Sequence, residues 1–205
     1  MIDITNDYSQ LHVHNAWHLV YYLSKFRNTE GTFSNYIIKF KESDLATIKA
    51  WTRWSVTELR NLNIKFDYVI RALGSSELHP QPRSKSLDVI GHHLEKNCAS
   101  IYCPEILMKT KATPPMHTLR TRPERFEAMH MSYCVADKKF DLNNKNILIL
   151  DDVTTARITT GEMLRALRVE WPRARFYIFC LGKTAYDDYL NDVVPIAQFN
   201  ALLNA

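Results

Sequence analysis

The sequence predicts an α/β fold, a parallel sheet flanked by helices, because β-rich apolar runs alternate with segments of helical periodicity from residue 66 onward. The β-rich runs lie at residues 66–73, 99–108, 147–150 and 175–181, with a last short strand expected within residues 193–199. Apolar residues recur at helical spacing within residues 84–96 and again from Met163 to Trp171. Strands that alternate with helices are typical of a parallel sheet with right-handed crossovers.

The composition is that of a soluble globular protein, with 46% hydrophobic and 23% charged residues. The 205 residues suffice for one domain with a full core and leave little room for a second. No apolar run approaches the length of a membrane span, so we expect a cytoplasmic protein without a membrane partner. The four cysteines include no Cys-x-x-Cys pair, so neither a zinc site nor a disulfide framework is expected.

The first third of the chain is predicted to be helical. His14, Trp17, His18, Tyr21, Tyr22 and Phe26 recur with a loose helical period, and Ile48, Trp51, Leu59 and Leu62 recur more clearly. We therefore expect residues 1–66 to form a helical N-terminal region and residues 67–205 to form the α/β core. The aromatic residues of the first region are explained either by packing or by a surface for a protein partner.

The most informative stretch begins with the apolar run at residues 147–150, which reads as a buried strand and ends on Asp151 and Asp152. Because side chains alternate along a strand, we expect both acids at the carboxyl edge, where the chain leaves the sheet. A hydroxyl-rich loop follows and runs into a helix, whose first N–H groups favour an anion. Carboxylates accept hydroxyl hydrogens or bind hard cations. The pattern indicates a ligand with a phosphate and either a vicinal diol or Mg²⁺; a strand end with an N-cap cluster is the other interpretation.

This stretch resembles the phosphoribosyl pyrophosphate (PRPP) motif of type I phosphoribosyltransferases, which has four apolar residues, two acids and a Thr-rich loop with a glycine. The resemblance implies a Rossmann-like type I phosphoribosyltransferase fold in which Asp151 and Asp152 are the catalytic acids that hold the ribose hydroxyls. It implies a loop for the 5′-phosphate at Thr154, Thr155, Ala156, Arg157, Ile158 and Thr159. In an alignment without gaps, Arg157 stands where the family has its glycine. A gapped alignment would instead use the Thr-Thr-Gly that ends at Gly161, but it lengthens the loop, so we prefer the first.

Two further segments are interpreted through the same resemblance. The family's pyrophosphate loop corresponds to Ala72, Leu73, Gly74, Ser75 and Ser76, where small residues bring backbone N–H groups close to an anion. The basic, proline-containing segment 109–127 is predicted to be a flap, and Arg120, Arg122 or Arg125 is expected to close over the pyrophosphate. Its Lys-Thr-Lys-Ala-Thr opening, and the Tyr/Lys segment at residues 36–41, resemble the ComF-like subgroup. A solvated face or, less decisively, a nucleic-acid surface would also explain the basic cluster.

The resemblance implies an enzyme that binds PRPP with Mg²⁺, which the ligand itself would hold, and transfers the phosphoribosyl group to or from a nitrogenous acceptor. The alternative is a non-catalytic sensor of PRPP or a nucleotide, or a toxin-like effector of a bacterial antiphage system such as a retron. No histidine cluster has metal-ligand spacing. The acceptor and the oligomeric state are left open by the sequence.

Overall fold

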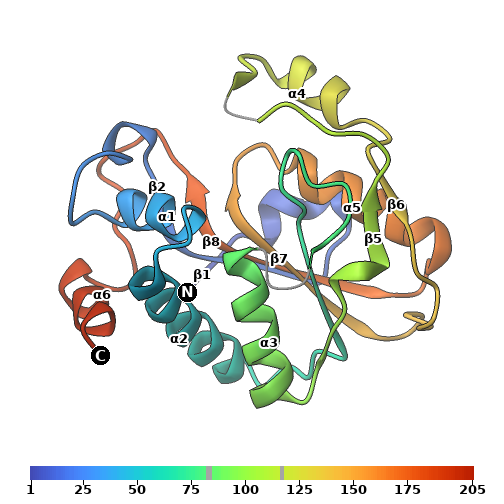
Figure 1. Cartoon of the computed structure of the whole chain (residues 1–205), viewed down its shortest axis with the longest axis horizontal. Coiled ribbons are helices and arrows are strands. Elements are labelled where there is room, and N and C mark those ends of the chain that lie inside the picture. Colours follow the sequence, from blue (N-terminus) through green and yellow to red (C-terminus); the bar gives the residue numbers. More distant parts are fainter. Residues whose placement is uncertain (82–84, 116–117) are drawn as a thin grey trace.

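A six-stranded sheet lies at the centre of the computed structural model, which describes residues 1–81, 85–115 and 118–205 (Figure 1). The strand order is β1 (Ile2–Asp3), β2 (Asn15–Tyr22), β8 (Arg175–Thr184), β7 (Asn146–Thr154), β3 (Tyr68–Arg71) and β4 (Ile101–Tyr102). β1 pairs with β2 in antiparallel orientation, and the other four neighbouring pairs are parallel. The predicted α/β class with a parallel central sheet is therefore confirmed.

Helices cover both faces of this sheet. The α-helices are α1 (Phe33–Lys41), α2 (Leu45–Asn61), α3 (Ser86–Cys98), α4 (Arg122–Met129), α5 (Ile158–Glu170) and α6 (Ile196–Leu203). Short 3-10 helices in the described ranges include η1 (Thr5–Leu11), η2 (Ser24–Phe26) and η3 (Pro104–Ile106). None of the helices in the described ranges combines the length and the apolar character that crossing a bilayer requires.

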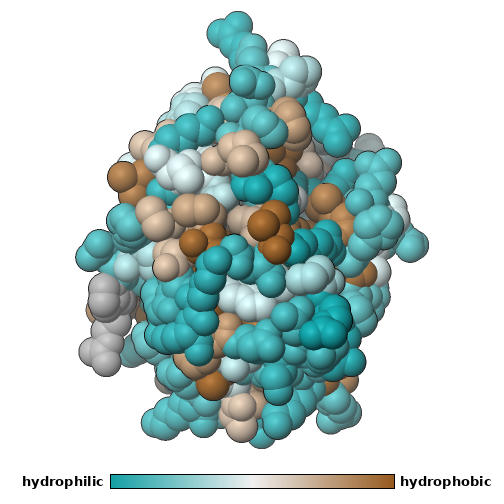
Figure 2. Space-filling model, turned by 90° about the vertical axis from the view of Figure 1, so that its right-hand side faces the viewer, coloured by the Kyte–Doolittle hydropathy of each residue, from teal (hydrophilic) through white to brown (hydrophobic). Residues whose placement is uncertain are grey.

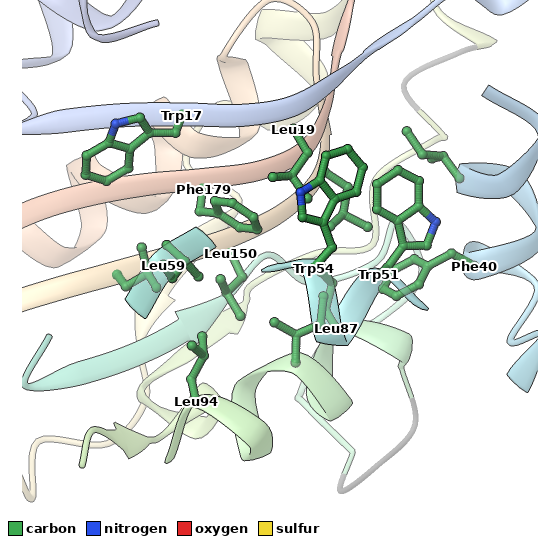
Figure 3. Close-up of a cluster of buried hydrophobic side chains, with 14 of the residues drawn as sticks. Trp17, Leu19, Phe40, Trp51, Trp54, Leu59, Leu87, Leu94, Leu150 and Phe179 are labelled. Atoms are coloured by element: carbon green, nitrogen blue, oxygen red, sulfur yellow. The ribbon is translucent and has the colours of Figure 1, made fainter. Parts of the chain in front are cut away.

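The alternation of side chains along β7 divides the core into two clusters. Leu148 and Leu150 point into the cluster that α1, α2, α3 and α6 cover, and Figure 3 shows Leu150 there with Trp51 and Trp54. Ile147 and Ile149 point into the opposite cluster, together with residues of α5 and η1. A strand covered on both faces must be apolar at every position, which explains the uninterrupted run at residues 147–150.

The helical prediction for residues 1–66 holds for α1 and α2 but is wrong for residues 15–22, which form β2. Residues 16–20 are all buried, because β2 lies inside the sheet between β1 and β8. A strand that is buried on both faces shows no alternation of apolar and polar residues. The spacing of its aromatic residues was therefore consistent with a loose helical period. Residues 1–66 therefore contribute two strands, β1 and β2, to the same sheet as the predicted core.

Two other predicted strands are also corrected. The run at residues 99–108 is divided into β4, η3 and β5 (Leu107–Lys109), because Pro104 has no N–H to donate to a strand partner. β5 leaves the main sheet and pairs in antiparallel orientation with β6 (Tyr133–Val135). The strand expected within residues 193–199 is instead α6, which begins directly after Pro195. The predicted helix at residues 84–96 is α3, and residue 84 lies outside the described residues.

The side of the molecule that carries β5, β6 and α5 is mainly hydrophilic (Figure 2). Apolar residues appear there in small separate groups rather than in one continuous patch. Such scattered apolar residues are normal on the surface of a folded chain.

Candidate functional site

The carboxyl ends of β2, β3, β7 and β8 open onto a cavity of about 780 Å³. Parallel strands that end at one edge of a sheet bring together loops that are distant in the sequence. The acid pair and the loop after β7, the loop after β3, and residues of α1, β5 and α4 all line this cavity. The sequence-predicted site residues thus converge, with the exceptions given below.

Asp151 and Asp152 belong to β7 itself, because the strand continues to Thr154 rather than leaving the sheet at the acids. The two side chains therefore point to opposite sides of the strand end, although both border the cavity. Each carboxylate also accepts the backbone N–H of the next residue: the N–H of Asp152 lies 2.9 Å from Asp151 Oδ1, and that of Val153 lies 2.6 Å from Asp152 Oδ1. These local bonds fix the orientation of both acids.

The two acids differ in their surroundings. Burial and then the neighbouring Asp152 carboxylate raise the pKa of Asp151 to about 7, so this group titrates near neutral pH. Asp152 instead forms an ion pair with Lys41, whose Nζ lies 3.1 Å from Oδ1. Burial alone would lower the pKa of Lys41, but the charge of Asp152 outweighs it and raises that pKa. One acid is therefore close to its titration point while the other is paired with a cation.

The loop between β7 and α5 has the features of an anion-binding site. None of the backbone N–H groups of residues 155–160 donates to an acceptor in the part of the chain that the structure describes. Hydrogen bonds from Thr154 to the Tyr8 hydroxyl (2.8 Å) and from Thr155 to Thr184 (2.7 Å) hold the loop, with either hydroxyl able to donate. Open amides at the start of a helix attract negative charge.

Arg157 has a left-handed backbone conformation, with φ 60° and ψ 16°, directly before α5. A residue other than glycine adopts this conformation at a cost of about 1–2 kcal/mol. The position aligned with the family's glycine in the ungapped alignment therefore keeps a backbone conformation that glycine favours. The alternative in which Gly161 takes this role finds no support here, because Gly161 lies inside α5.

The loop after β3 is shaped by a buried ion network. Arg71 is 1% exposed and donates two hydrogen bonds, of 2.7 and 2.9 Å, to the carboxylate of Glu77, and it also contacts Asp88. Glu77 in turn accepts the N–H of Gly74 at 2.9 Å. The network thus closes the loop over residues 71–77, and the guanidinium holds the pKa of Glu77 below its usual value against the effect of burial.

This network uses part of the predicted pyrophosphate loop internally. The N–H of Ala72 donates to the carbonyl oxygen of Leu150, and the N–H of Leu73 donates to the Tyr133 hydroxyl. The N–H of Gly74 donates to the carboxylate of Glu77. The N–H groups of Ser75 and Ser76 have no acceptor among the described residues, and Ser76 does not line the cavity. Of the five predicted residues, Ser75 is the one whose open amide borders the cavity.

The sequence shows Lys109 only as one member of the basic segment 109–127. In the structure, Lys109 is a buried residue of the cavity wall. Its side chain is held by the carbonyl oxygen of Gly74 at 2.8 Å and by Thr113 Oγ1 at 3.2 Å. Burial lowers its pKa to about 8, while the carboxylates of Glu77 and Asp151 act in the opposite direction. An ammonium that is desolvated in this way can neutralise an anionic ligand more strongly than a solvated one.

The predicted flap contributes one of its three arginines to the cavity. Arg125, on α4, lines it, whereas Arg120 and Arg122 do not. Arg120 lies before α4, which begins with a capping box between Thr121 and Glu124, and Arg122 lines a separate cavity. Of the three arginines, Arg125 is the one that borders this cavity.

The fit of Mg²⁺ can be judged from the donor atoms. The described residues contain no group of three or more His, Cys, Asp or Glu that could hold a metal ion. Mg²⁺ commonly binds through one or two carboxylates together with ligand phosphates and waters, rather than in a cage of side chains. The carboxylates of Asp151 and Asp152 suit that mode, in which a polyphosphate ligand supplies the remaining oxygens.

Comparison with known proteins does not assign the chain to a family. No family model matches the sequence, and no curated protein matches it. Among solved structures, the chain has a weak match to the crystal structure of a hypothetical protein from Neisseria gonorrhoeae with bound ppGpp. That similarity has a TM-score of 0.38 and 14% sequence identity, and it covers 78% of this chain and 93% of the other.

Proposed function

We propose that this protein binds PRPP together with Mg²⁺ and transfers the phosphoribosyl group to or from a nitrogenous acceptor. The observation that carries the proposal is the position of the acid pair beside six open backbone amides, in one cavity at the carboxyl end of the sheet. In a ribose 5-phosphate group, a methylene group joins the phosphate to the ring that carries the vicinal diol. Such a ligand would place its phosphate against the amides and its hydroxyls against the carboxylates. The cavity volume lies within the range usual for small-molecule sites.

Each part of the ligand has a counterpart among the cavity residues. The amides of residues 155–160 would hold the 5′-phosphate, while Asp151 and Asp152 would accept hydrogen bonds from the ribose hydroxyls. Lys109, Arg125 and the amide of Ser75 would neutralise the pyrophosphate. Mg²⁺, which the ligand itself would hold, would supply positive charge that favours departure of the pyrophosphate.

The reaction requires mainly positioning and charge stabilisation from the protein. The bond between ribose C1 and the pyrophosphate oxygen breaks, and its electron pair leaves with the pyrophosphate. The acceptor nitrogen forms the new bond to C1 and loses its proton. Lys109, which is largely protonated at pH 7 because its pKa is about 8, would stabilise the charge that develops on the leaving group.

The direct test of turnover is release of pyrophosphate from PRPP in the presence of Mg²⁺ and a panel of nitrogenous bases. We expect release that depends on one class of base and that is abolished in a variant carrying both Asp151→Asn and Asp152→Asn. Arg120→Gln serves as the control, because Arg120 does not line the cavity. PRPP binding without pyrophosphate release, for any base, would favour the sensor function instead.

Asp152→Asn should weaken PRPP binding by about 1.5–3 kcal/mol, the range for hydrogen bonds to charged groups. Its stability should change by less than about 1 kcal/mol, because the Lys41–Asp152 ion pair is 40% and 32% exposed at its two side chains. Calorimetric titration and urea unfolding measure the two effects. A variant that loses several kcal/mol of stability and keeps its PRPP affinity would make Asp152 a structural residue.

A further inference from the structure

A second cavity, of about 600 Å³, lies on the other side of the loop that leads into α5. Its walls are η1, α4, and the first turn of α5. Ala156, Arg157 and Ile158 line both cavities, so the loop forms a partition between them. No part of the proposed phosphoribosyl transfer uses this second cavity.

Met129 of α4 lines both cavities, and other side chains on or next to this helix line one cavity each. The second cavity is lined by Arg122, Phe126 and His130, which follow one another at intervals of four residues. Arg125 lines the first cavity instead. The rings of Phe126 and His130 lie 5.5 Å apart at an interplanar angle of 27°, and Phe126 is 57% exposed. This face of α4 thus offers an uncovered aromatic surface next to a guanidinium.

Arg157 lines the second cavity as well as the first, and its backbone belongs to the predicted phosphate loop. Its guanidinium carbon lies 6.0 Å from the centre of the ring of Tyr8, a buried residue of η1. Arg157 and Arg122 form no ion pair with any carboxylate in the described ranges.

The other charged groups around the second cavity are already neutralised. Arg165 is paired with Glu162, with a distance of 2.8 Å between Nη2 and Oε1, and it also donates to the carbonyl oxygen of Tyr133. Asp7 is paired with Lys183 at 2.5 Å. The two cations without a partner among the described residues, Arg122 and Arg157, therefore set the sign of the charge that a ligand must carry.

We propose that the second cavity binds a nucleoside monophosphate, with its base against Phe126 and His130 and its phosphate between Arg122 and Arg157. Aromatic side chains stack on the flat face of a base, and guanidinium groups match the geometry of phosphate oxygens. Leu11 and Ile158 supply apolar contacts to the remainder of the ligand. The inference stands independently of phosphoribosyl transfer, since it uses a different cavity.

The probe is a 2′,3′-dideoxynucleoside 5′-monophosphate, because it lacks the hydroxyls that the acid pair of the first cavity would recognise. Isothermal titration should show saturable binding of one molecule per chain, at least about tenfold tighter than binding of the matched dideoxynucleoside without its phosphate. Arg122→Gln and Phe126→Ala should each weaken binding about tenfold, since stacking and charge-assisted contacts are of that size. Both side chains are exposed, so neither change disturbs the core.

The controls separate this site from the first cavity. Asp152→Asn and Arg120→Gln should leave binding of the probe unchanged, because neither residue lines the second cavity. Absence of binding, or binding that survives both Arg122→Gln and Phe126→Ala, overturns the proposal. If inorganic phosphate binds as tightly as the probe, the site is a general anion site and the proposal is overturned. A single-stranded oligonucleotide that binds more tightly than the probe also overturns the proposal. A protein that fails to bind PRPP but binds the probe refutes the proposed function alone.

Discussion

Replacing Arg71 with methionine should lower the free energy of unfolding by about 3–5 kcal/mol, the range for removing one partner of a buried ion pair. The guanidinium is fully buried between the carboxylates of Glu77 and Asp88. Without it, these two acids remain in the interior with no opposing charge from Arg71. The loop at residues 71–77 would also lose the contact that holds Glu77 against the amide of Gly74.

Urea unfolding of the Arg71→Met variant measures this loss, and Arg120→Met is the matched control on the surface. The pKa of Glu77 is lower in the folded protein than its ordinary value of 4.5, so its contribution to stability is present above that pH and is lost as the pH falls through the folded pKa. The difference between wild type and variant should accordingly shrink in acid below pH 4.5. A loss below about 1 kcal/mol at neutral pH would contradict the role of the network.

Asp151→Asn should make the protein more stable at pH 8 and at the same time weaken its binding of PRPP. The pKa of Asp151 is raised from 3.8 to about 7 on folding, so between these values the folded protein binds a proton that the unfolded chain has released. Stability therefore falls as the pH rises from about 4 to 7, and the penalty persists above 7. Asparagine carries no charge and should remove this dependence.

The same substitution removes a carboxylate that would accept a hydrogen bond from the ribose, so PRPP affinity should fall by about 1.5–3 kcal/mol. Thermal unfolding at pH 5 and pH 8, together with calorimetric titration of PRPP, measures both effects. A gain in stability combined with a loss of binding is the behaviour of a residue kept for function at the expense of stability. An Asp151→Asn variant that is less stable than wild type at pH 8 would indicate a structural role.

The central strand and the loop after it were predictable because their determinants are local. Four consecutive apolar residues specify a buried strand, although this strand continues past the two acids to Thr154, and the helix after the loop follows from its apolar spacing. The sequence also identified the loop after β3 by its small residues. What it did not show is that the buried pair of Arg71 and Glu77 closes this loop, since ion pairs across a turn leave no periodic pattern.

Residues that reach the site through tertiary packing were harder to predict. Lys41 meets Asp152 only because α1 packs beside the end of β7, and Lys109 is buried only because β5 pairs with β6. A charge run in the sequence does not reveal which of its members is buried, so Lys109 was grouped with solvated lysines and arginines. The same holds for the three flap arginines: the charge pattern does not reveal that Arg125 lines the first cavity and Arg122 the second, while Arg120 lines neither.

The most direct measurement is a crystal structure of the protein with PRPP and Mg²⁺. The account predicts that the 5′-phosphate oxygens accept hydrogen bonds from the amides of residues 155–160, and that the ribose hydroxyls lie against Asp151 and Asp152. The pyrophosphate should lie on the side of Lys109 and Arg125. A ligand whose phosphate lies away from this loop, or whose ribose leaves both carboxylates without contact, would contradict the assignment of the cavity to PRPP.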